Sequence, residues 1–167
     1  MNDAHLHMVV NHFPIIGTIL GLGILIAGLV LKNKSVQNTA YVLFVIAAVF
    51  GFFSMSTGEG AEEIVEDFPG IGKAIIHEHE EMAEKLAIVL YALAITSLFG
   101  LYSNWKNKPK AKLVSYIATV VAIIAVFFAQ QTGTTGGEVR HTEIRTDSTA
   151  VGSNAEQISP TKEEEKE

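Results

Sequence analysis

The sequence predicts an all-α integral membrane protein, a four-helix bundle made of two αα-hairpins and followed by a disordered C-terminal tail. The 167 residues are 49% hydrophobic and only 18% charged, whereas a typical soluble domain has about 25% charged residues. Four stretches of roughly 17–19 residues carry no charge at all and are long enough to cross the ~30 Å hydrocarbon core of a bilayer as helices. One such stretch could be a buried core helix, but four of them cover nearly half the chain and indicate membrane spans.

These stretches define one transmembrane domain over residues 1–145, with helices expected at about 13–31, 40–56, 83–102 and 113–131. Pro14 suits the first turn of the first helix. Gly17 and Gly21 form a G-x-x-x-G pair, a spacing that lets a neighbouring membrane helix approach closely. From residue 146 the chain turns to Ser, Thr, Asn, Glu and Lys, a composition that predicts a disordered polar tail over 146–167.

The distribution of lysine predicts the orientation of the bundle. The connections 32–39 and 103–112 carry six lysines and no acidic residue, so the positive-inside rule places them in the cytoplasm. All 18 acidic residues and all six histidines then lie on the outer side, together with both termini. No Lys or Arg precedes the first apolar stretch, which predicts a retained anchor rather than a cleaved signal peptide. We expect an aromatic belt at the inner interface from Tyr41, Tyr102, Trp105 and Tyr116.

Two short similarities suggest an internal repeat. His5-Leu6-His7 precedes the first hairpin, and His77-Glu78-His79 precedes the second one 72 residues later. The first hairpin leaves the membrane through Thr57-Gly58 and the second through Thr132-Gly133, a displacement of 75. Two hairpins related by an axis along the membrane normal would give this pattern.

Composition excludes several kinds of site. The chain has no cysteine, so it holds no disulfide, no thiolate-bound zinc or iron–sulfur cluster and no covalently attached c-type haem. A net charge of −6 argues against nucleic acid as a partner. The spans contain no ionisable residue at mid-membrane depth, which argues against a transport path.

Histidines that precede or follow the helices are the main candidates for a cofactor site. In the predicted topology they gather at the outer mouth of the bundle, where His and Glu from several helices commonly hold metals and haems. His12 lies at the membrane boundary, and His79 shares a helical stripe with Leu86, Leu90 and Leu93. His77 shares its stripe with three glutamates, as expected for a solvated helix face. The predicted cofactor ligands are His12 and His79 first, then His7 and His141.

Carboxylates near the same mouth could complete a metal site. The alternative to haem is a divalent metal bound by His and Glu, because imidazole suits zinc, copper and iron whereas carboxylates favour harder ions. The predicted metal ligands are His12, His79, Glu62, Glu63 and Glu138. Gly136 and Gly137 could form a turn after the fourth helix that brings His141 back over the mouth.

Several of these residues also carry a resemblance to a known family. His7-x-x-x-x-His12-Phe13-Pro14, Thr57-Gly58, a histidine at the start of the third span, and Gly136-Gly137 with His141 resemble the bacterial four-helix membrane family called domain of unknown function 2231. The resemblance covers about residues 5–143 and departs from the family at Met8, where a proline is expected, and in the additional His5 and His77. It implies a multi-pass protein of the bacterial inner membrane that works beside cytochrome or Rieske-type redox proteins. It also assigns cofactor ligation to His7, His12, His79 and His141.

The sequence therefore leads to one favoured function and two alternatives. The favoured function is electron transfer through a b-type haem, or another metal, at a periplasm-facing His/Glu site. The first alternative is a non-redox assembly subunit or a periplasmic metal-ion binding protein, as a monomer or a homo-oligomer. The second is an enzyme, which the sequence favours least because it contains no nucleophile motif.

Overall fold

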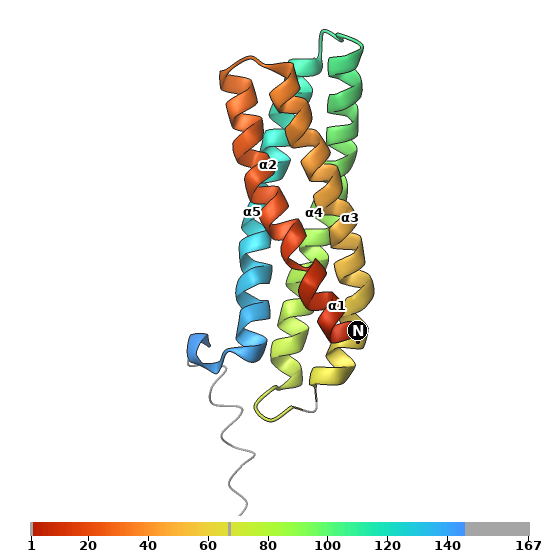
Figure 1. Ribbon diagram of the computed structural model, residues 1–167. Coiled ribbons are helices and arrows are strands. Elements are labelled where there is room, and N and C mark those ends of the chain that lie inside the picture. The colour runs from red at the N-terminus through yellow and green to blue at the C-terminus, as the bar shows by residue number, and fades with distance from the viewer. Residues whose placement is uncertain (1, 67, 146–167) are drawn as a thin grey trace, which may run out of the picture.

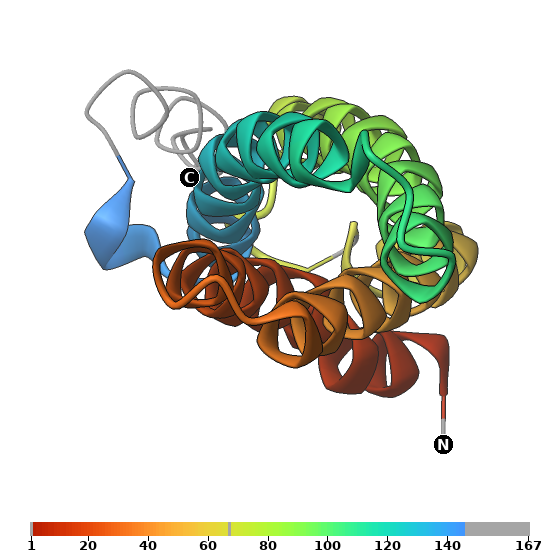
Figure 2. The same cartoon turned by 90° about the horizontal axis from the view of Figure 1, so that it is seen from above.

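Four long helices form an antiparallel bundle in the computed structural model, which describes residues 2–66 and 68–145. The elements are α1 (Asp3–Val10), α2 (His12–Val30), α3 (Lys34–Val65), α4 (Lys73–Trp105), α5 (Ala111–Arg140) and a short 3-10 turn, η1 (Thr142–Ile144). Helices α2 to α5 stand side by side and run up and down (Figure 1). Viewed along their axes they form a ring in the order α2, α3, α4, α5 (Figure 2). The predicted all-α four-helix bundle is confirmed.

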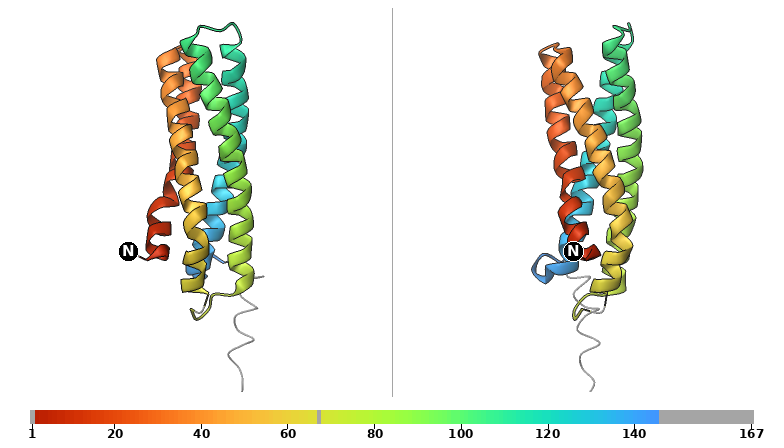
Figure 3. Two further views of the ribbon diagram at one scale, coloured as in Figure 1. Left: turned by 90° about the vertical axis from the view of Figure 1, so that its right-hand side faces the viewer. Right: turned by 45° about the vertical axis from the view of Figure 1, so that its right-hand side comes forward.

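The bundle has two chemically different ends. The connections 31–33 and 106–110 form one end, which we call the lysine end. Helix α1, the connection 66–72 and the last turns of α5 form the other, which we call the histidine end. Helix α1 bends away from the axis of α2 after a turn at Asn11 and packs against the outside of α3 (Figure 3).

The helices are longer at the histidine end than predicted. Helix α3 continues nine residues beyond 56, α4 begins ten residues before 83, and α5 continues nine residues beyond 131. Hydropathy detects only the part of a helix that faces lipid, and the charges beyond it do not stop helix formation. Gly136 and Gly137 lie inside α5, so the predicted turn at these glycines is wrong. The predicted tail, 146–167, lies outside the described residues.

Small residues bring the helices together. Alanines form the buried face of α5, where Ala118, Ala122, Ala125 and Ala129 have no exposed surface. A Cβ added to Gly17 would lie 3.2 Å from Ala47 Cβ, and one added to Gly21 would lie 2.5 Å from the ring of Phe44. This close approach of α2 to α3 confirms the prediction made from the G-x-x-x-G pair. Tyr41, predicted at the membrane interface, is instead fully buried and donates its hydroxyl to Ser115 at 2.9 Å.

Large apolar side chains cover the outside of the bundle. Ile88 is 68% exposed and Phe99 62%, and many others like them point away from the core along all four helices. A water-soluble protein rarely exposes apolar surface on this scale. All four long helices have the length and hydropathy of membrane spans. By these criteria the chain is a multi-pass membrane protein.

The structure supports the internal repeat, with the predicted displacement of 72 between the first helices of the two hairpins and a corrected displacement between the second helices. Of the six buried residues of α2, five have a buried counterpart 72 positions later in α4. Of the seven buried residues of α3, five have a buried counterpart 78 positions later in α5, whereas the predicted displacement of 75 matches only two. Helix α3 packs on α4 as α5 packs on α2, so a pseudo-twofold axis runs along the bundle (Figure 2).

Candidate functional site

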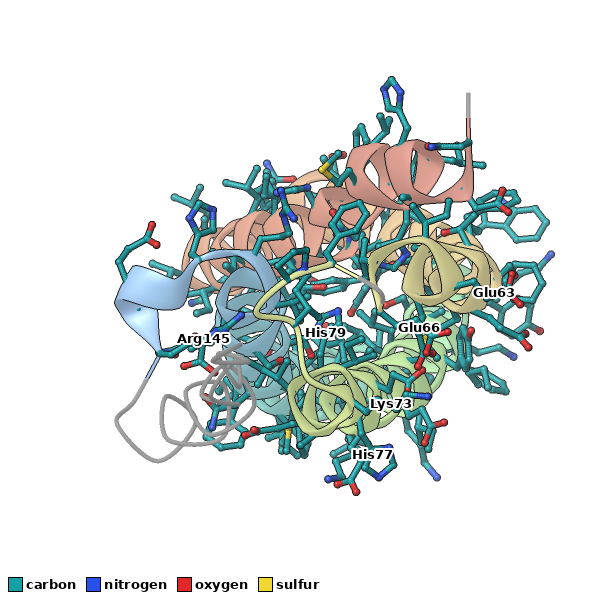
Figure 4. All side chains as sticks on the ribbon, turned by 90° about the horizontal axis from the view of Figure 1, so that it is seen from below. Glu63, Glu66, Lys73, His77, His79 and Arg145 are labelled. Carbon is teal, nitrogen blue, oxygen red and sulfur yellow. The ribbon has the colours of Figure 1, made fainter. Side chains whose placement is uncertain are left out.

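Two histidines occupy equivalent positions in the two hairpins. His7 lies on α1 and His79 on α4, 72 residues apart, which is the displacement that relates the buried faces of α2 and α4. Both side chains are partly buried. Figure 4, which looks onto the histidine end, shows His79 pointing inward between the helices, whereas His77 points away from them.

Each imidazole is held by the facing helix of its own hairpin. His7 Nδ1 lies 3.1 Å from the carbonyl oxygen of Ser54 and 3.2 Å from the hydroxyl of Thr57 on α3. His79 Nδ1 lies 3.1 Å from the hydroxyl of Thr135 on α5. Thr57 and Thr135 are 78 residues apart, so each histidine and its threonine follow the same repeat as the buried faces.

These contacts determine which ring nitrogen carries the proton. The Thr57 hydroxyl donates to the carbonyl of Phe53 at 3.0 Å, and the Thr135 hydroxyl donates to that of Gln131 at 3.1 Å. The carbonyl oxygen of Ser54 can only accept, so Nδ1 of His7 is the donor in that contact. With their single protons donated to their own helices, the two threonine oxygens accept from the imidazoles. In the neutral rings Nδ1 is therefore the donor. The Nε2 atoms of both histidines then keep a free lone pair, which is the form in which imidazole binds a metal.

The two imidazoles lie at the same end of the bundle, on helices of different hairpins, with glycines near them. A Cβ added to Gly136 would lie 2.8 Å from Cε1 of His79, and one added to Gly58 would lie 3.9 Å from Cε1 of His7. These glycines are again 78 residues apart. At Gly136 the missing side chain leaves room for the ring, whereas an added Cβ at Gly58 would make an ordinary van der Waals contact.

Two of the four predicted histidine ligands lie elsewhere. The side chain of His12 is exposed, and its Nδ1 lies 3.0 Å from the carbonyl oxygen of Met8 on the preceding turn. His141 is exposed beyond the end of α5, with its Nδ1 2.9 Å from Glu143. The pKa of Glu143 is lowered by its own backbone N–H and by the His141 imidazole, both of which hydrogen-bond to the carboxylate. The structure brings His7 and His79 together, whereas His12 and His79 were the first choice from the sequence.

The predicted carboxylates do not join the histidines. Glu63 is exposed and lies at the edge of the bundle in Figure 4. Glu62 lies within hydrogen-bond reach of Glu80 on α4, and Glu138 is buried in α5. Within residues 2–66 and 68–145, no three His, Asp or Glu side chains come together as ligands for a metal ion.

Arg145 is a further residue of this end, which the sequence analysis missed. Its guanidinium donates to the carbonyl oxygens of Glu138 at 2.7 Å and Val139 at 3.0 Å, and across to Gly70 at 2.8 Å. It thereby joins the end of α5 to the connection between α3 and α4 (Figure 4). The only sequence signal was an isolated arginine just after the last span.

Compared with protein-family models, with curated proteins and with solved structures, the chain matches none.

Proposed function

We propose that the protein binds one b-type haem through His7 and His79 at the histidine end and serves electron transfer in the membrane. One observation carries the proposal. Two histidines on different helices have Nδ1 occupied by a threonine of the facing helix and a free lone pair on Nε2. Haem iron is commonly bound by histidine nitrogen, and ligands for such cofactors in bundles come from facing helices.

The chain's own residues would bind and orient this group. Thr57 and Thr135 fix the tautomer and direction of the two rings, as hydrogen-bond partners of metal-bound histidines commonly do. Gly136 leaves space beside the ring of His79. A bound haem would supply one-electron transfer.

The setting of this function belongs to the same proposal. We place the lysine end in the cytoplasm of a bacterium and the histidine end on the periplasmic side of its inner membrane. We further propose that the chain belongs to the family called domain of unknown function 2231. Its electron partners would be cytochrome or Rieske-type proteins. The support is the resemblance carried by His7, His79 and Thr57-Gly58, together with the six lysines in and beside the two connections of the lysine end.

Titration of the detergent-purified, full-length protein with haemin tests the proposal. We expect saturation at one haem per chain and much weaker binding in both His7→Ala and His79→Ala. His12→Ala is the matched control and should bind as the unaltered protein does. If haemin does not bind but zinc or copper does, and this binding needs both histidines, the site is a colourless metal site and the haem proposal is wrong.

A further inference from the structure

The two halves of the bundle differ most at the lysine end. The displacement between the halves is 72 residues in their first helices and 78 in their second, so the path from a buried residue of α4 to one of α5 is six residues longer than the equivalent path from α2 to α3. The first connection is only 31–33, whereas the second is 106–110 and follows a longer helix. The added residues need an explanation, because a three-residue connection is enough to close the first hairpin.

These additional residues form a basic hollow. An open hollow on the surface is lined by Ser103, Lys108, Pro109, Lys110 and Val114. Two of its five lining residues are lysines, and the sequence has no Asp or Glu from residue 85 to residue 137 that could neutralise them. A hollow with this charge favours an anion.

The backbone beside the hollow also favours an anion. In the first hairpin, the side chain of Asn33 caps α3 by accepting from the N–H groups of Ser35 and Val36. Helix α5 begins after Lys110, which makes no side-chain cap hydrogen bond, and it has no acidic residue in its first turn. Helix α5 thus lacks the side-chain cap that its counterpart α3 has.

The surroundings place this hollow at the level of lipid headgroups. Trp105 is 72% exposed, and the Lys106 ammonium lies 4.1 Å from its ring centroid. Tyr116 and Leu113 are 50% and 53% exposed on the adjoining face of α5. Exposed aromatic residues mark the interface between water and hydrocarbon, so an anion here would have acyl chains beside it.

We propose that this hollow binds the phosphate group of an anionic phospholipid. Lys108 and Lys110 supply the charge, Ser103 a polar wall, and Val114 the side next to the acyl chains. Basic pockets beside membrane helices are a recurrent way to bind anionic headgroups. This proposal is independent of the haem proposal, because it concerns the opposite end of the bundle.

Native mass spectrometry of the full-length protein, released from vesicles of phosphatidylglycerol and phosphatidylcholine, tests it. We expect retained phosphatidylglycerol in preference to phosphatidylcholine. Replacing Lys108 and Lys110 together by Gln should reduce the retention of phosphatidylglycerol. Each lysine removed should lower it roughly fivefold, the effect of about 1 kcal/mol per basic residue. The matched control is Lys32→Gln with Lys34→Gln, which removes the same charge from the lysine end of the first hairpin and should retain most of the lipid.

Three outcomes would overturn the proposal. Equal losses in the two double variants would mean that general attraction of the lysine end, and not the hollow, holds the lipid. Equal retention of both lipids would mean that the headgroup charge is not recognised. Displacement of the lipid by inorganic phosphate alone would identify a site for free phosphate. Circular dichroism of both double variants checks that their helices are intact.

Discussion

At the scale of single residues, the site depends on two threonines with the same double role. Each donates a hydrogen bond to a carbonyl of its own helix and accepts one from an imidazole of the facing helix. Thr57 does so for His7 and Thr135 for His79. Because these roles belong to hydroxyl groups, they can be tested with side chains of the same shape.

Thr135→Val keeps the volume of the side chain and removes the acceptor at His79 Nδ1. The ring then loses its fixed tautomer, and we expect haemin affinity to fall by about 10–100-fold, the usual effect of losing such a partner. Thr134→Val is the control, since the Thr134 hydroxyl is exposed and bonds only to the carbonyl of Gln130 at 3.1 Å. Haemin titration of both variants measures the difference, and equal affinities would show that Thr135 does not orient the ring.

Gly136→Ala tests whether the space beside His79 matters. The new methyl group would lie 2.8 Å from Cε1 of His79, so the ring must move, and we expect weaker haemin binding with the helical content unchanged. At Gly133 the nearest atom to an added Cβ is Ile15 Cδ1, at 3.6 Å, so Gly133→Ala should bind haemin as the unaltered protein does. A haemin affinity that is unchanged in Gly136→Ala would contradict this account of the site.

At the scale of helices, the pairing of His7 with His79 could have been predicted and was not. His7 lies at the same offsets from the buried Pro14, Thr18 and Gly21 as His79 does from Leu86, Leu90 and Leu93. His12 follows His7 by five residues, which places it about 140° around a helix, on a different face. Hydropathy could not show whether His7 or His12 faces the bundle, because both lie in the polar segment before the first apolar stretch. The displacement of 72 residues that relates α2 to α4 also relates His7 to His79, and this would have predicted the pair.

The extent of the helices was less predictable. The four uncharged stretches located all four spans, because charged side chains are unfavourable in the hydrocarbon core of the bilayer. Beyond the apolar stretches, the segments of α3 and α5 that contain glycine and glutamate remain helical because they pack on α1 and α4. These contacts join residues far apart in the sequence, so a short segment does not reveal them. The sequence therefore did not predict where the helices end on the histidine side. It also did not predict that Thr135 and Gly136 lie on α5.

Helix packing toward the lysine end depends on a glycine that faces an aromatic ring. A Cβ added to Gly100 would lie 2.5 Å from the ring of Tyr41, which is buried and tied to Ser115. We expect Gly100→Ala to destabilise the bundle by about 1–3 kcal/mol, the usual cost of overpacking. Gly23→Ala is the control, because no atom lies within 4 Å of an added Cβ. Unfolding in denaturing detergent measures both, and equal stability would contradict the close contact of α3 and α4.

At the scale of the whole molecule, the pseudo-twofold axis relates the two halves of the site. Two hairpins of one chain take the place of two subunits, and each contributes one histidine and the threonine that holds it. The lysine end departs from this symmetry through the longer second connection. We infer that one end of the bundle keeps a shared site while the other has diverged.

The orientation of the molecule can be tested directly, because the chain has no cysteine. Lys32→Cys lies at the lysine end and Pro69→Cys at the histidine end, and both positions are exposed. With a thiol reagent that cannot cross the membrane, we expect intact cells to label only position 69, and permeabilised cells to label both. Labelling of position 32 in intact cells would reverse the proposed topology.

The most direct test of the central claim is the absorption spectrum of the purified protein from haem-replete cells, first oxidised and then reduced with dithionite. The account predicts the sharp reduced bands of a b-type haem with two histidine ligands. These bands should be lost in His7→Ala and in His79→Ala and kept in His12→Ala. A featureless spectrum, or bands that survive the loss of either His7 or His79, would contradict it.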